Sequence, residues 1–221
     1  MMTGKIVFAG AVLCLLAGTA GAQMGGMMRP PQYRGVWNPV VGGGAVYSLE
    51  HSGGEKTSME MTVVGKETVE GKEGYWFELV MDSPRGEGQV VMKMLFVLDG
   101  DNTVTRRMIM QMPGRDPMEM PMQMMQARGR GSQPADVRGL SDDAGSETVT
   151  TPAGTFACEH YRMKDGSGDA WVAKNISPYG LVKYTGKDTT MVLTKVITDA
   201  KDKITGTPKA FNPMEMGRPP N

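Results

Sequence analysis

The chain has 221 residues and no formal net charge at pH 7, with 24 Lys and Arg against 24 Asp and Glu. With 40% apolar and 22% charged residues it is long enough to fold around a core of its own. The balanced charge excludes a protein that binds nucleic acid through phosphate contacts, because such binding needs a basic excess. Only 2 His residues leave little for acid–base catalysis or a multi-His metal site.

The first 22 residues have the pattern of a secretory signal peptide. Lys5 precedes an apolar run from Ile6 to Leu16, and Ala20-Gly21-Ala22 matches an A-x-A cleavage site. The run is too short to span a bilayer as a helix, and Cys14 lies inside it rather than after a small residue, which argues against a lipoprotein anchor. We therefore expect cleavage after Ala22, no transmembrane segment, and a periplasmic or secreted protein.

Composition divides the rest of the chain into three parts. Residues 23–32 are expected to form a disordered lead-in, residues 33–205 a single β domain, and residues 206–221 a flexible, Pro-rich tail. Within the domain, residues 113–143 are rich in Pro, Gly, Arg and Met and are predicted to form a long loop or lid. Cys158 is the only cysteine left after cleavage, so no internal disulfide is expected.

Short runs of alternating apolar and polar residues, separated by Gly, Asp and Asn turns, predict antiparallel β-structure with little helix. The expected strands are Ala45–His51, Thr57–Gly65, Gly74–Asp82, Gly88–Leu98, Thr103–Met112, Glu147–Thr151, Thr155–Lys164, Asp169–Ala173, Leu181–Tyr184 and Thr189–Asp199. No stretch has a convincing helical period, and Pro121 interrupts the one short candidate helix, residues 117–127.

Methionine is the most unusual component of the chain, with 22 residues of this type. Alternation places Met92 and Met94 on one face of a predicted strand. Three more share a face of the next strand: Met108, Met110 and Met112. Flexible thioether side chains can pack a core or adapt to variable apolar ligands. We predict that these five methionines line an apolar binding surface, while simple packing remains open.

The methionine-rich run continues beyond these strands. Its further members are Met118, Met120, Met122, Met124 and Met125. Thioethers are soft ligands that suit Cu(I), so an alternative interpretation is a Cu(I)- or Ag(I)-binding periplasmic protein. The scarcity of His and Cys around the run weakens this alternative.

Cys158 and His160 alternate onto one face of a predicted strand, beside Phe156 and Arg162. Such a pair can be a thiolate nucleophile with its base. The sequence supplies no third group that would orient the histidine, so a buried core cysteine is the favoured interpretation. No catalytic residue is predicted.

The stretch from Glu147 to Lys195 carries a family resemblance. It reads E-T-V-T-T-P-A-G-T-F-A-C-E-H-Y-R, then G-D-A-W-V-A-K, P-Y-G-L-V-K and M-V-L-T-K, with Gly74-Tyr-Trp-Phe-Glu78 upstream. This resembles a family of secreted bacterial proteins of unknown function (DUF4412-like), itself similar to the periplasmic lipoprotein-carrier (LolA-like) half-barrels. The resemblance implies a single curved antiparallel sheet, open or half-barrel, whose concave face can hold acyl chains.

Together these features favour a non-enzymatic extracytoplasmic binding protein without a cofactor. It would hold a lipid, an acyl chain or a hydrophobic envelope partner such as a lipoprotein, with residues 113–143 gating the site. We expect a monomer with no nucleic-acid partner. The metal-binding alternative and a structural or interaction role without a small ligand both remain open.

Overall fold

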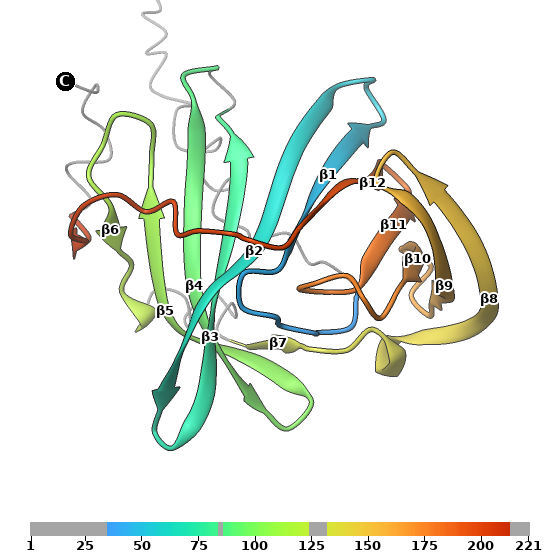
Figure 1. The fold of residues 1–221 in the computed structure, drawn as a ribbon, viewed down its shortest axis with the longest axis horizontal. Helices are drawn as coiled ribbons and strands as arrows, with labels where there is room; N and C mark the ends of the chain where they lie inside the picture. Colours follow the sequence, from blue (N-terminus) through green and yellow to red (C-terminus); the bar gives the residue numbers. More distant parts are fainter. Residues whose placement is uncertain (1–34, 84–85, 124–131, 213–221) are drawn as a thin grey trace, which may run out of the picture. The chain divides into compact units, whose positions relative to one another are not determined.

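The computed structural model describes residues 35–83, 86–123 and 132–212, and it is mostly β (Figure 1). Thirteen strands form one open sheet in the order β13-β6-β5-β4-β3-β2-β1-β12-β11-β10-β9-β8, with β7 paired to β5 beside that path. Every pairing is antiparallel except that of β13 with β6.

The strands are β1 (Gly44–His51), β2 (Lys56–Val69), β3 (Lys72–Asp82), β4 (Gln89–Asp99), β5 (Asn102–Gln111), β6 (Met118–Glu119), β7 (Ser132–Pro134), β8 (Ser141–Thr151), β9 (Gly154–Met163), β10 (Gly168–Val172), β11 (Leu181–Gly186), β12 (Thr189–Ile197) and β13 (Lys209–Ala210). Apart from the 3-10 turn Arg138–Leu140, no complete helix lies within the described ranges.

The sheet consists of two meanders joined side by side. Strands β1 to β5 follow one another through hairpins, as do β8 to β12, and the first strand of one meander pairs with the last strand of the other. In a flat sheet β8 and β11 would lie about 14 Å apart, because neighbouring strands are spaced by about 4.8 Å. Instead β8 approaches both β11 and β12 within 8 Å, so this half of the sheet rolls up on itself.

All ten predicted strands are present, and the mostly β, largely antiparallel open sheet is confirmed. The segment 113–143, expected as a loop, contains β6, β7 and the start of β8. The predicted tail from residue 206 begins with a segment that supplies β13. The signal peptide and the lead-in lie outside the described residues.

The two faces of the first meander differ in chemistry. One face, here the methionine face, is buried and apolar, and its members are Met59, Met61, Phe77, Leu79, Met92, Met94, Phe96, Met108 and Met110. The other, the charged face, includes Glu60, Glu78, Lys93, Arg107 and Glu119. The alternation of side chains along each strand produces this division.

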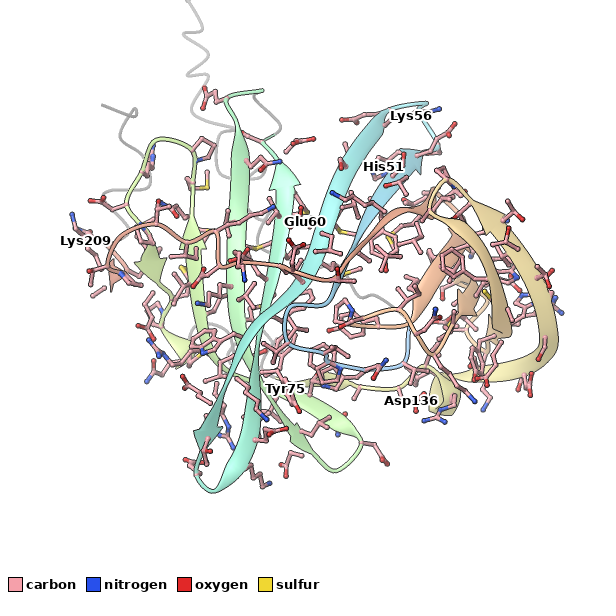
Figure 2. The ribbon with its side chains drawn as sticks, in the orientation of Figure 1. His51, Lys56, Glu60, Tyr75, Asp136 and Lys209 are labelled. Atoms are coloured by element: carbon pink, nitrogen blue, oxygen red, sulfur yellow. The ribbon has the colours of Figure 1, made fainter. Side chains whose placement is uncertain are left out.

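The C-terminal segment 199–212, here the strap, crosses the charged face (Figure 1, red). Lys203 forms an ion pair with Glu60 of β2 at 2.7 Å, near the point where the strap passes over that strand (Figure 2). Gln111 at the end of β5 donates from Nε2 to the Thr205 hydroxyl at 2.9 Å and accepts the Thr205 N–H at 2.9 Å. The strap then ends in β13, which pairs with β6.

Candidate functional site

Six methionines form two rows across β4, β5 and β6. Met92 lies directly opposite Met110, which lies opposite Met118. Met94 lies opposite Met108, whose carbonyl accepts the backbone N–H of Met120 at 2.8 Å. Side chains in such positions have Cβ atoms about 5 Å apart. These six residues are called the methionine array: Met92, Met94, Met108, Met110, Met118 and Met120.

The array includes four of the five residues predicted to line an apolar site. Met92, Met94, Met108 and Met110 are 0%, 2%, 2% and 4% exposed, so they lie in the closed core rather than on an open surface. Met112, the fifth, is half-buried just beyond the end of β5. A ligand would therefore reach these side chains only if the segments that cover the methionine face move.

Of the residues predicted for the metal alternative, the structure brings Met118 and Met120 into the array. They are 4% and 6% exposed. Met122 is half-buried two residues further on. Met124 and Met125 lie outside the described residues. The two methionine groups that the sequence analysis treated as alternatives therefore share one buried cluster, because β6 pairs with β5.

Irregular backbone, with Trp37 at its centre, covers part of the methionine face. The Trp37 ring lies 5.7 Å from the Phe96 ring, 6.3 Å from that of Phe77 and 5.0 Å from that of Tyr179. Trp37 itself is only half-buried, so its outer edge reaches solvent. The rings that cover Phe77 and Phe96 thus come from two irregular segments, residues 35–38 and the β10–β11 connection, rather than from a helix.

Two other segments hold residues 35–38, here the Trp37 cover, in place. Val36 and Asn38 donate backbone N–H groups to Tyr179 and Pro178 at 2.8 and 2.7 Å. On the other side, Trp37 donates to Ala135 at 3.0 Å, and Val137 donates to Gly35 at 3.0 Å. Ala135 and Val137 belong to the predicted lid 113–143 and are buried. The role of a gate for this segment remains a prediction.

A buried carboxylate marks the charged face beneath the strap. Glu78 is 0% exposed and accepts the backbone N–H of Lys203 at 3.0 and 3.3 Å from its two oxygens. Burial raises the pKa of Glu78 to about 7, and Asp202 adds to the rise, while the Lys203 N–H and Lys93 oppose it. Thr62, directly opposite on β2, has a buried hydroxyl without a hydrogen-bond partner among the described residues.

Cys158 does not have the surroundings of a reactive thiolate. It is 2% exposed, and its thiol donates to the Phe156 carbonyl at 3.6 Å. Burial raises the pKa of Cys158 to about 11, with a further rise from the Glu147 charge. The thiol is therefore protonated at neutral pH, as expected for the core cysteine that the sequence favoured.

His160 has orienting partners that sequence reasoning missed. Its Nε2 lies 2.8 Å from Asp169, its Nδ1 lies 3.3 Å from Glu147, and its ring stacks on Trp171 with centroids 4.5 Å apart. Trp171 in turn donates its indole N–H to Glu147. With both ring nitrogens facing carboxylates, His160 cross-links β8, β9 and β10 and has no nitrogen directed at Cys158. The sequence could have placed Asp169 and Glu147 beside His160, by counting residues back from the β8–β9 and β9–β10 hairpin turns.

The described residues contain neither a metal-ligating cluster of His, Cys, Asp and Glu side chains nor a membrane-spanning helix. No group of three or more His, Cys, Asp or Glu in the ranges given above is arranged to hold a metal ion. No helix in the same ranges is long and apolar enough to cross a membrane.

Comparison with known proteins finds structural similarity at low sequence identity. The chain matches no protein-family model. No curated protein matches it either. A protein from Bacteroides fragilis, described as exported and as having a YmcC-like fold, is 16% identical with a TM-score of 0.38, over 74% of this chain and 99% of its own. A protein from Parabacteroides distasonis, described as a lipoprotein, is 15% identical with a TM-score of 0.37, over 75% of this chain and 100% of its own.

Proposed function

We propose that the protein is a non-enzymatic extracytoplasmic binding protein that takes a lipid acyl chain against its methionine face, beneath the Trp37 cover. The observation that carries the proposal is a methionine-rich sheet face onto which a short irregular segment packs. Unbranched, flexible methionine side chains can repack around an inserted chain at low cost. The signal-peptide pattern of residues 1–22 supports an extracytoplasmic location.

The cover is short, so opening it would break a defined set of contacts. Four backbone hydrogen bonds and the bond from Asn38 Nδ2 to the Lys174 carbonyl at 2.8 Å fix residues 35–38 to their neighbouring segments, and the half-buried Trp37 supplies the ring that packs on Phe77 and Phe96. Displacing Trp37 would expose aromatic and methionine side chains to an incoming chain. Burial of that chain would provide a driving force of about 25 cal/mol per Å² of apolar surface removed from water.

Native mass spectrometry of the mature protein, purified from the periplasm without detergent, is the first test. We expect a bound species of lipid mass, and uptake of a fluorescent fatty acid after delipidation. A clean mass, together with no uptake of fatty acid or phospholipid by the delipidated protein, would refute the proposal. Metal binding and a structural or interaction role would then be the surviving interpretations.

A matched pair of tryptophan variants tests the route of entry. Trp37→Ala removes the ring from the cover, whereas Trp76→Ala removes one from the charged face, where Lys93 lies 4.7 Å from its ring centre. We expect Trp37→Ala to accelerate fatty-acid uptake several-fold and Trp76→Ala to leave the rate unchanged. Equal rates in the two variants would place the entry elsewhere.

A further inference from the structure

We propose that the methionine array is also a site for a soft monovalent cation, Cu(I) or Ag(I). Its donors are six thioether sulfurs in two rows of three, on β4, on β5 and on residues 118–120, which include β6. Thioethers bind Cu(I) in preference to hard divalent cations. The inference depends on the register of β4, β5 and β6 and not on lipid uptake.

The register gives the array the compactness that a metal site needs. Each row brings three methionines from three strands onto one face, with neighbouring Cβ atoms about 5 Å apart. A methionine side chain has three rotatable bonds beyond Cα, so three sulfurs from such a row can converge on one ion. The row Met92–Met110–Met118 and the row Met94–Met108–Met120 each supply such a set.

The surroundings of the array favour a single positive charge over two. Its members are 6% exposed or less, and Leu79 and Phe77 of β3 lie opposite Met92 and Met94 on its inner side. The nearest ion pair on the same strands, Arg107 with Glu119 at 2.8 Å, lies on the opposite face. A divalent ion would lose far more hydration in this apolar setting, where sulfur donors compensate only a soft cation.

Two half-buried methionines close to the array offer a path for the ion. Met112 lies two residues after Met110, just past the end of β5, and Met122 lies two residues after Met120, past the end of β6. Each provides a thioether that solvent reaches, from which an ion can pass to the buried sulfurs.

The test is an anaerobic Cu(I) titration of the mature protein against a chromophoric chelator, with Ag(I) binding followed by native mass spectrometry. The test variant is Met108→Leu with Met110→Leu, which removes the central sulfur of each row and keeps the apolar volume. The matched control is Met59→Leu with Met61→Leu, at positions 1% and 0% exposed on the same face but on β2. Leu-for-Met exchanges of this kind cost little stability, so both variants should fold.

We expect the array variant to bind Cu(I) at least about tenfold more weakly, which corresponds to about 1.4 kcal/mol, and the control variant to match the parent protein. Absence of Cu(I) and Ag(I) binding by the parent, or equal affinities in the two variants, would overturn the proposal. Replacing every methionine with norleucine removes all thioether sulfur, leaves the thiol of Cys158 in place and keeps side-chain flexibility. It should abolish metal binding while lipid uptake persists, so the metal site and the lipid site can fail separately.

Discussion

At the scale of single residues, Glu78 is the group whose ionisation the fold perturbs most clearly in the physiological range. Burial raises its pKa from 4.5 to about 7 in the folded chain, with the strap docked over it. Once the strap lifts, the side chain returns to water and its pKa falls toward the ordinary value. The docked state therefore binds a proton more tightly, and docking is strongest below about pH 4.5 and weakens as pH rises through 7.

This linkage predicts a pH-dependent strap. Between pH 5 and 8 the docking of the strap should weaken by up to about 3 kcal/mol, because the pKa of Glu78 is about 7 when the strap is docked and falls toward 4.5 when it lifts. Hydrogen exchange of the Lys203 and Thr205 amides, corrected for intrinsic rates, should show protection decreasing over that range. Glu78→Gln carries no titrating proton and should show flat protection. A pH dependence that persists in Glu78→Gln would assign the effect to the neighbouring charges Lys93, Asp202, Lys203 and Glu60.

Cys158 carries the second prediction at this scale. With its pKa raised from 9.0 to about 11, its thiolate fraction at pH 8 should be about 100-fold below that of an ordinary thiol. In a Cys14→Ser background, reaction with a disulfide reagent should be at least that much slower in the native protein than in denaturant. Native labelling at the denatured rate would show that the thiol is open to attack and would revive the thiolate interpretation.

At the scale of the elements, the long central strands were predicted well from the local sequence. The strands of the hairpins β3–β4 and β4–β5 were predicted to within a few residues, although residues 77–80 and 94–97 are buried without interruption and so do not follow an alternating pattern. The first residues of β8 were missed because Ser141–Ser146 are polar and mostly exposed, so no alternation marks them. Strands β6 and β13 have two residues each and depend on pairing between distant segments.

The candidate site was also predicted only in part: the sequence indicated which residues share a strand face, but not what packs on that face. Alternation along β4 and β5 identified Met92, Met94, Met108 and Met110 as one face, and pairing confirmed that they share it. Whether they are buried could not be decided from the sequence, because segments that pack on this face are distant in sequence: the Trp37 cover, which packs on Phe77 and Phe96, is held by backbone hydrogen bonds to residues 135–137 and 178–179. These hydrogen bonds join main-chain atoms, so no pattern of side chains in the sequence indicates them.

The strap offers a prediction about β6. Gln111 links the end of β5 to Thr205 through side-chain hydrogen bonds in both directions, and β13 then pairs with β6. Gln111→Leu should loosen this attachment and increase amide exchange at Met118 to Met120 by about tenfold, from the loss of bonds worth about 1 kcal/mol each. The control Gln89→Leu removes a glutamine whose side chain, among the described residues, makes one hydrogen bond, to Asp82 at 3.4 Å. Equal exchange in both variants would mean that β6 is held independently of the strap.

At the scale of the whole described unit, the pairing of β1 with β12 makes one sheet from two meanders. These strands are the only ones that join the two halves of the strand order, and their register runs from Gly44 opposite Ile197 to His51 opposite Thr189. Tyr47 and Leu193, opposite each other in this seam, are both 0% exposed, and the Tyr47 hydroxyl donates to the Leu181 carbonyl at 2.9 Å. The core of each half therefore depends on side chains from the other.

This shared seam predicts that the two halves unfold together. Variants that retain only Trp76, on β3, report on the first meander, and variants that retain only Trp171, on β10, report on the second. Their denaturant transitions should coincide, and Leu193→Ala, which leaves a cavity at the seam, should destabilise both by the same amount, about 3 kcal/mol. Thr190→Ala lies at the end of the same strand at a half-buried position and should shift both by less than about 1 kcal/mol. Two separate transitions, or a Leu193→Ala effect confined to the Trp171 signal, would mean that the meanders are independent units that merely share an edge.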